Sequence, residues 1–307
     1  MSQSNPAPYL TAVGSKQRLL YVKQLGNGEN PLVFVHGLSA THEFFGPLID
    51  AAGLTKTHKI YLYDFEGHGL SPVDSASEPS LQHHVEDLLG ILQKFDLEQA
   101  TIVAHSMGCL IAEAFATQHV SLFNMMVLLG PLPYMLSSGG KEIMHKRAAI
   151  IREAGVVAVA VAVAEAGTPA DIRNKNPLAT SLVRLSTLAQ SSEGYASASI
   201  SLGECDVNIN PRQFLFKTLM VVGADDKVAP PMAAGNLALE LGEYTSRFSQ
   251  VWATDMSMKT LYATAMREYL GLLTAGHARD GNFLRMGAWL IWTTWGGDGL
   301  VVGDFGI

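Results

Sequence analysis

One serine lies where a predicted buried strand meets a predicted helix. The stretch Thr101–Ala112 has the sequence Thr-Ile-Val-Ala-His-Ser-Met-Gly-Cys-Leu-Ile-Ala. Its β-branched start predicts a strand and its continuation a helix, so Ser106 falls on the sharp turn between them. Such a turn exposes the hydroxyl beside a helix N-terminus, where backbone N–H groups point at a developing anion. Ser106 is therefore a candidate nucleophile, and an ordinary buried serine in a βα turn is the alternative.

Small residues are expected around such a serine, because the strand and the helix crowd each other at the turn. Gly108 supplies one of them. Ala104 stands where the usual G-x-S-x-G pattern has its first glycine, which is a mild departure because alanine is also small.

Acyl transfer also needs two N–H donors that stabilise the negative charge of the tetrahedral intermediate. The expected donors are the backbone N–H groups of Met107 and Leu38. Gly37, at the end of the hydrophobic run Pro31–Val35, lets that loop approach closely. Leu38 and Met107 are thus the predicted oxyanion hole.

A carboxylate is needed to orient the general base of a serine nucleophile. Asp226 fits this role, because it lies three residues past Gly223, at the end of a later predicted strand. Asp225 is its competitor. The acidic pair could equally form a turn or cap the helix that begins near Pro230.

Composition limits the classes of function. The chain has 307 residues, of which 48% are hydrophobic and 16% charged, so one large α/β domain with an insertion, or two domains, can form. The net charge of −7 and the lack of a basic run argue against nucleic acid and anionic membranes as partners. Two cysteines make no disulfide framework, and no cysteine or histidine spacing indicates a metal site, so we expect no metal and no cofactor.

The ends of the chain and its longest apolar runs bear on localisation. The first nine residues are polar and contain no secretory apolar segment, and no apolar run reaches the ~20 residues of a membrane span. A cytoplasmic location is the expectation. The sequence does not indicate an oligomeric state.

Strand and helix signals alternate through the first 132 residues. Strands are predicted at 19–24, 31–35, 59–64, 101–103 and 122–129, with helices at 41–52, 80–95 and after Ser106; a strand at 216–223 and a helix at 232–241 follow later. This alternation predicts βαβ units and a mostly parallel sheet, with the site at the carboxyl ends of the strands.

Strand signals vanish between Pro133 and about Pro211, where helix formers dominate. An all-helical insertion is predicted there, placed to act as a lid over the site; a plain helical subdomain with no gating role is the alternative. The predicted organisation is a flexible lead-in (1–15), an α/β core (16–132 and 212–260), a helical cap (133–211) and an atypical C-terminal tail (261–307).

Four motifs together resemble the landmarks of the α/β-hydrolase superfamily. They are Val33-Phe-Val-His-Gly-Leu, Tyr63-Asp-Phe-Glu-Gly-His-Gly-Leu-Ser, Ala104-His-Ser-Met-Gly and Val222-Gly-Ala-Asp-Asp-Lys-Val-Ala-Pro. The insertion is similar to that of the 3-oxoadipate enol-lactonase group, through segments 146–156 and 192–198. The resemblance covers roughly residues 18–245. It implies an α/β-hydrolase fold and a serine nucleophile, with Asp64 and His68 as residues that structure a loop.

The family order of serine, acid and histidine implies a base in a Gly-His loop near residues 251–261, but that stretch contains no histidine. Only His277, preceded by Gly276, follows Asp226 in the chain. Three interpretations stay open: His277 is the base after an extra helix, the protein lacks a working triad, or the chain after about Gln250 is not the family's own ending, through a retained intron or a shifted reading frame.

The expected function is a serine hydrolase of a small carboxylic ester or lactone, an enol-lactone by resemblance, with Ser106, Asp226 and His277 as the catalytic residues. A substrate carboxylate would call for a cation, which Arg147, Arg152 or Arg184 of the insertion could supply. A non-catalytic protein with the same fold is the alternative. A changed chemistry, such as C–C bond cleavage, is a third hypothesis, and Ser106 weighs against a haloalkane-type reaction.

Overall fold

The computed structural model describes residues 10–74, 80–168, 170–205, 207–223, 226, 228–241, 246–251, 292–296 and 299–303. Eight strands form one sheet in the order β1-β2-β4-β3-β5-β6-β7-β8. Their bounds are β1 Leu10–Val13, β2 Arg18–Leu25, β3 Asn30–Val35, β4 His58–Tyr63, β5 Ala100–His105, β6 Phe123–Leu129, β7 Lys217–Gly223 and β8 Ser246–Val251. The pairs β1–β2 and β2–β4 are antiparallel, and all the others are parallel. The predicted mostly parallel sheet is confirmed.

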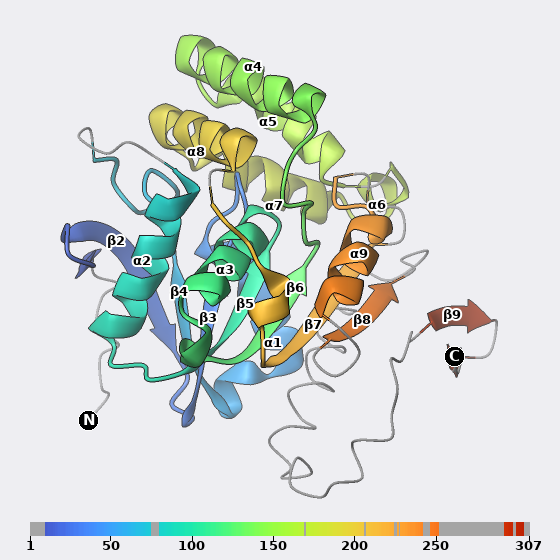
Figure 1. The fold of residues 1–307 in the computed structure, drawn as a ribbon. Coiled ribbons are helices and arrows are strands. Elements are labelled where there is room, and N and C mark those ends of the chain that lie inside the picture. The colour runs from blue at the N-terminus through green and yellow to red at the C-terminus, as the bar shows by residue number, and fades with distance from the viewer. Residues whose placement is uncertain are drawn as a thin grey trace, which may run out of the picture.

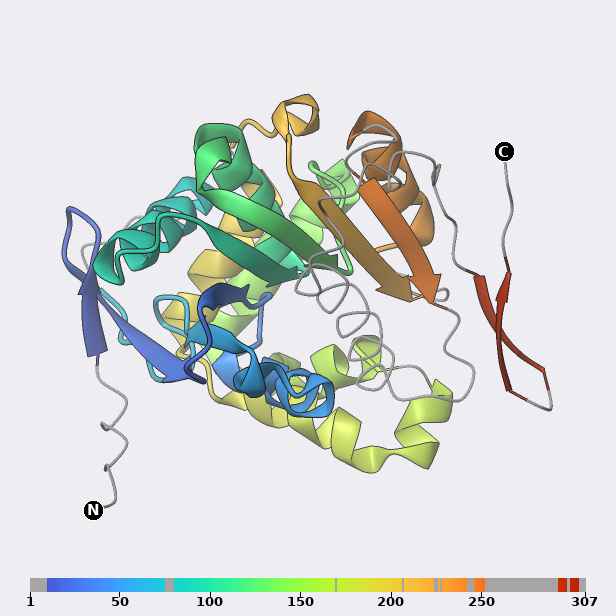
Figure 2. The same ribbon diagram turned by 90° about the horizontal axis from the view of Figure 1, so that it is seen from below.

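Helices cover both faces of the sheet. Helices α2 (Leu81–Lys94), α3 (Met107–Gln118) and α9 (Pro231–Leu241) lie on one face, and α1 (Gly46–Ala52) lies on the other (Figures 1 and 2). Short 3₁₀ turns at His42–Phe45, Leu54–Lys56, Val120–Leu122 and Pro211–Gln213 connect these elements. This two-sided cover explains why the central strands are continuous apolar runs.

Strand β5 shows how the sheet positions the serine. Its side chains alternate between the two cores: Ile102 and Ala104 pack on the side of α2 and α3, and Val103 packs on the side of α1. All three are fully buried. Because β5 lies between β3 and β6, the residue that follows it is held from both sides.

Two predicted elements differ from the structure. Leu10–Val13, assigned to the flexible lead-in, forms β1 and pairs with β2 across a turn in which Gly14 and Gln17 have positive φ. Four residues are too few to show the alternation of apolar and polar side chains that indicates a strand, so the sequence does not predict β1. The helix predicted over 41–52 is divided into a 3₁₀ turn and α1, because Gly46-Pro47 begins a new helix and proline suits its first turn.

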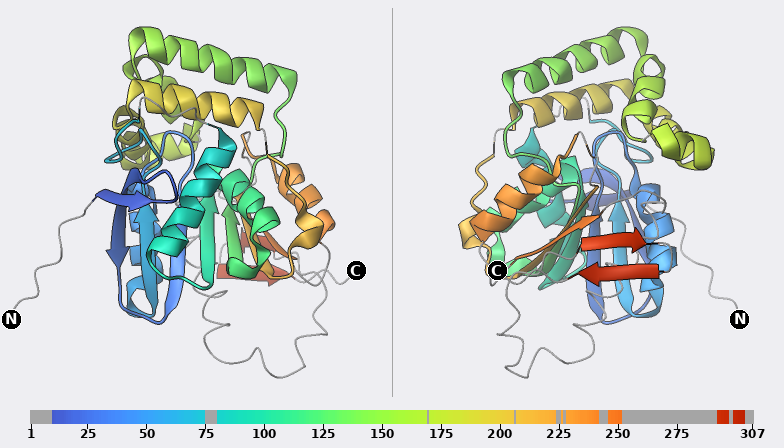
Figure 3. Two further views of the ribbon diagram at one scale, coloured as in Figure 1. Left: turned by 60° about the vertical axis from the view of Figure 1, so that its left-hand side comes forward. Right: turned by 90° about the vertical axis from the view of Figure 1, so that its right-hand side faces the viewer.

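Five helices connect β6 to β7, within the stretch assigned to the cap. They are α4 Ser138–Ala154, α5 Val157–Ala166, α6 Ala170–Lys175, α7 Pro177–Leu188 and α8 Ser192–Glu204. They lie at the carboxyl ends of the parallel strands, with α8 between α4 and the core (Figure 3). The described residues of this stretch contain no strand.

The start of α8 is where the cap touches the core backbone. Ser191 N–H and its hydroxyl both donate to Gly67 O at 3.0 Å. A Cβ on Gly194 would lie 2.5 Å from the Cα of Gly67, and Gly67 has a φ of +70°. Gln190 Nε2 also donates to Ala40 O at 3.1 Å. The cap is thus joined to the loop after β4 and to the loop after β3.

The described part of the predicted tail is a two-stranded antiparallel hairpin of β9 (Trp292–Gly296) and β10 (Gly299–Gly303). The rest of 261–307, His277 included, lies outside the described residues.

Candidate active site

Ser106 occupies the turn between β5 and α3 with an unusual backbone. Its φ is 53° and its ψ is −119°. Residues other than glycine rarely adopt this conformation, which costs them on the order of 1–3 kcal/mol. Ser106 N–H donates to Leu129 O of β6 at 3.0 Å, and Ser106 O accepts from Cys109 N–H at 2.8 Å. Strand β6 and the first turn of α3 therefore hold the turn in place. Such strain is typical of functional positions.

The loop after β3 touches the serine directly. A Cβ on Gly37 would lie 2.9 Å from Ser106 Cβ and 3.0 Å from His105 Nδ1, so only glycine fits there. The N–H of Leu38 donates no hydrogen bond to any described residue. Met107 is the first residue of α3, which leaves its N–H outside the intrahelical ladder. Two uncommitted N–H groups thus flank the serine, as an oxyanion hole requires.

Asp226 follows strand β7, which is separated from the strand that precedes Ser106, β5, by the single strand β6. Its Oδ1 accepts hydrogen bonds from the N–H groups of Val228 and Ala229, both at 2.8 Å. Its Oδ2 would be 3.7 Å from a Cβ on Gly130, the residue after β6. Since Leu129 binds Ser106 N–H, the end of β6 lies between the serine and this carboxylate. The two hydrogen bonds to Oδ1 are equally consistent with the alternative in which Asp226 only stabilises a turn. The competing residue, Asp225, lies outside the described residues.

No described histidine ring hydrogen-bonds to Ser106. The ring of His105 stacks on Phe44, with centroids 4.4 Å apart, and its Nδ1 is buried without a partner among the described residues. His36 accepts from Phe65 N–H at Nε2 (3.0 Å), and its Nδ1 lies 2.8 Å from Gly37 O. Both rings support the loops around the site. The predicted base, His277, is outside the described residues.

Asp64 organises the loop after β4. Its carboxylate accepts from His42 N–H at 2.7 Å and from Leu70 N–H at 2.9 Å, and His42 Nδ1 lies 2.9 Å from both of its oxygens. Burial raises the pKa of Asp64, but the hydrogen bonds from His42 and from Leu70 N–H and the nearby imidazole of His36 outweigh it, so the net pKa is lowered. The expectation that Asp64 structures this loop is confirmed.

Buried imidazoles predict an acid-sensitive fold. Burial lowers the pKa to about 3 for His36 and to about 4 for His68 and His105. These rings stay neutral in the folded chain but bind protons near pH 6.5 when unfolded, so each reduces stability by about 1.4 kcal/mol per pH unit as the pH falls from about 6.5 to 4. Burial raises the pKa of Asp87 to about 6 and that of Glu113 well above its usual value, which offsets part of this loss.

Urea unfolding near pH 7, 6 and 5 measures this dependence. We expect the free energy of unfolding to fall with pH by a net slope of at least about 1.4 kcal/mol per unit. A free energy that stays flat or rises between pH 6.5 and 5 would show that the rings are protonated in the folded chain.

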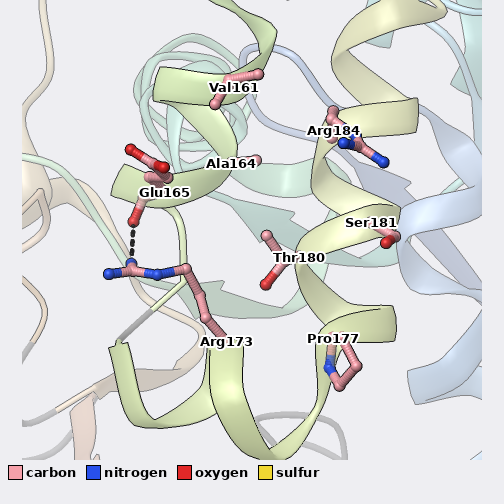
Figure 4. A pocket seen from close by; sticks show the side chains of 8 residues that line it. All are labelled: Val161, Ala164, Glu165, Arg173, Pro177, Thr180, Ser181 and Arg184. Carbon is pink, nitrogen blue, oxygen red and sulfur yellow. Dashed lines mark hydrogen bonds between the residues drawn. The ribbon is translucent and has the colours of Figure 1, made fainter.

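A pocket of about 290 Å³ lies within the cap, between α5 and α7 (Figure 4). It is lined by Val161, Ala164, Glu165, Arg173, Pro177, Thr180, Ser181 and Arg184. Arg173 is held by the backbone carbonyl oxygens of Glu165 and Thr168. None of its lining residues belongs to the loops around Ser106, so this pocket is separate from the candidate active site.

Residues 30–152 match the family model described as the alpha/beta hydrolase fold. The chain has the α/β-hydrolase fold. The match covers β3 to α4 and so includes the serine turn and the Gly37 loop. The strand order, the antiparallel β2 and the place of Ser106 after β5 all agree with this fold.

The curated relatives of this chain match it only in part. It is 29% identical to 3-oxoadipate enol-lactonase 2 of Acinetobacter baylyi over 55% of this chain and 62% of that protein. It is 30% identical to the probable lysophospholipase BODYGUARD 3 of Arabidopsis thaliana over 43% of this chain and 28% of that protein. The chain thus covers less than two thirds of the length of either relative.

Solved structures match the fold more fully. A thermophilic esterase from Thermogutta terrifontis superposes with a TM-score of 0.77 at 20% identity, over 87% of this chain and 98% of the esterase. The enol-lactonase from Burkholderia xenovorans LB400 gives a TM-score of 0.73 at 22% identity, over 85% of this chain and 98% of that one. These likenesses establish the α/β-hydrolase fold.

Among the residues that the structure describes, no group of three histidine, cysteine or carboxylate side chains could hold a metal ion. None of the described helices has both the length and the apolar character that crossing a bilayer requires.

Sequence patterns missed two aromatic residues beside the site. Phe44, which stacks on His105, and Tyr195, which packs under the loop after β3, come from elements far from Ser106 in the chain. In the sequence, the helical segments that contain Phe44 and Tyr195 indicate only that these side chains are buried. Contacts between distant segments leave no local spacing signal, so neither residue could be found by pattern.

Proposed function

We propose that this chain, which has the α/β-hydrolase fold, is a serine hydrolase of a small carboxylic ester or lactone. Ser106 Oγ attacks the carbonyl carbon while the base, His277, takes the hydroxyl proton, and Asp226 orients that imidazole. The N–H groups of Leu38 and Met107 donate to the oxyanion. The proton returns to the leaving oxygen, and water then hydrolyses the acyl-enzyme by the same steps in reverse.

The observation that carries this proposal is the strained turn of Ser106 beside two uncommitted N–H groups. A φ of 53° is strained for a serine and brings no packing advantage, so a purely structural buried serine would not be expected to adopt it. The partial likeness to an enol-lactonase favours a lactone, and the likeness to a probable lysophospholipase favours an ester. The candidate partner is therefore a small molecule with an activated carbonyl.

A fluorophosphonate probe tests the proposal against the alternative, a non-catalytic protein with the same fold. An activated serine forms a covalent adduct with the probe, and mass spectrometry of the digested full chain should locate it on the peptide that contains Ser106. A folded sample that stays unlabelled would favour the non-catalytic alternative.

Replacement of His277 by alanine should reduce p-nitrophenyl acetate hydrolysis by about 10³-fold or more if this histidine is the base, because an unassisted serine is a weak nucleophile. The matched control is His145→Ala, since His145 is an exposed cap residue paired with Glu204. An unchanged rate in His277→Ala would show that another group takes the proton.

A further inference from the structure

Helix α7 exposes an apolar row along its outer side. Leu178, Leu182 and Leu185 are spaced by four and three residues, so they lie on one face of the helix. Their exposed fractions are 79%, 38% and 60%. The opposite face of α7 packs inward through Thr187, which is fully buried. Single exposed leucines are ordinary on a protein surface, but a continuous row is typical of an interaction site.

Helix α5 adds a second apolar row beside the first. Nine of its ten residues are valine or alanine, and Val157 and Val161 are 68% and 57% exposed. Val161 also lines the pocket between α5 and α7 (Figure 4). On α7, the lining residues Pro177, Ser181 and Arg184 each directly precede one of the exposed leucines. The two rows therefore border the same pocket and form one surface, which we call the outer cap face: Val157, Val161, Leu178, Leu182 and Leu185.

Positive charge borders the outer cap face. Helices α6 and α7 contain one carboxylate, Asp171, and three cations, Arg173, Lys175 and Arg184. Arg184 is exposed, and no carboxylate of the described residues lies within ion-pair distance of it. Glu165 also lines the pocket and offsets one of these charges, which leaves the face net positive. A twofold contact between two copies would set this face against itself, so like charges disfavour a second copy as its partner.

We propose that the outer cap face binds the surface of a zwitterionic phospholipid bilayer, with its leucines and valines among the acyl chains and Arg184 hydrogen-bonded to a lipid phosphate. A helix lies in the membrane interface when its apolar face enters the acyl boundary and cations flank that face. A guanidinium beside the apolar row can bind a phosphate while its methylene groups stay among the chains. The net charge of −7 disfavours an anionic surface, so apolar burial supplies the attraction. No residue of this face belongs to the loops around Ser106, so the inference does not depend on the proposed function.

Co-sedimentation of the full chain with phosphatidylcholine vesicles tests the proposal. The bound fraction should change less than about 2-fold between about 0.05 and 0.5 M NaCl, because salt does not screen apolar burial. The double variant Leu178→Ser/Leu185→Ser should lower the partition coefficient about 10-fold or more, since two leucine side chains no longer leave water on binding. Arg184→Gln should lower it about 3-fold, because a neutral amide forms a weaker hydrogen bond to phosphate.

The matched control is Leu239→Ser, since Leu239 is 82% exposed on α9, outside the cap. It should leave the partition coefficient unchanged, and all variants should keep the wild-type thermal unfolding midpoint because these side chains point outwards. A wild-type chain that stays in the supernatant, or a double variant that binds as well as the wild type, would overturn the proposal. A dimer in sedimentation velocity that the double variant abolishes would assign the face to a second copy and overturn lipid binding. Binding that requires phosphatidylglycerol and is lost at about 0.5 M NaCl would overturn the zwitterionic surface.

Discussion

Replacement of Ser106 by alanine should abolish p-nitrophenyl acetate hydrolysis, lowering kcat/KM by about 10⁴-fold or more. The substitution removes only the hydroxyl group, and without its oxygen no acyl-enzyme can form. The backbone of the turn stays in place, because its hydrogen bonds to Leu129 and Cys109 are made by main-chain atoms. Steady-state rates and the thermal unfolding midpoint should be measured on the same samples.

The matched control is Ser121→Ala, in the 3₁₀ turn between α3 and β6, where Ser121 is exposed at the opposite end of α3 from Ser106. It should keep the wild-type rate. Loss of activity accompanied by a lowered unfolding midpoint in Ser106→Ala would mean that the fold, and not the nucleophile, was affected. Retained activity would exclude Ser106 as the nucleophile.

Gly108→Ala should destabilise the fold by about 3 kcal/mol or more. A Cβ at this position would lie 2.3 Å from Val35 O and 2.6 Å from His36 O. Both oxygens belong to the backbone at the end of β3, which cannot move without shifting the Gly37 loop. We therefore expect a lower unfolding midpoint in urea and a lower rate of ester hydrolysis together.

Gly235→Ala is the matched control, and we expect this glycine-to-alanine substitution to raise the stability of the fold. Gly235 lies inside α9, and a Cβ there would meet nothing within 4 Å. Alanine should stabilise the helix by about 0.5–1 kcal/mol, because it loses less backbone entropy on folding. If Gly108→Ala were as stable as Gly235→Ala, helix α3 and strand β3 would not be in the tight contact described.

The predictable parts of this fold are those set by neighbouring residues. The alternation around Ile102 and the βα turn at Ser106 depend on side chains a few positions apart, so the sequence predicts both. The clustering of strand ends follows from parallel strands, and it correctly places Gly37 beside Ser106. The order of the strands in the sheet is not predicted from the sequence, because periodicity carries no information about which strands pair.

The unpredicted parts depend on contacts between distant segments or on very short elements. Strand β1 has four residues and owes its existence to pairing with β2. Tyr195 reaches the loop after β3 from another layer of the molecule. The position of Asp226 beside Gly130 follows from the strand order, but its two backbone hydrogen bonds fit a turn and a catalytic carboxylate alike.

Gly67 and Gly194 meet through backbone atoms alone. The contact requires glycine at both positions, and the Ser191 hydroxyl adds a hydrogen bond to Gly67 O, so these three residues fix where the cap meets the core. The helices α4 to α7 contribute no atom to this contact, so changes in their length or lining leave this junction between cap and core as it is.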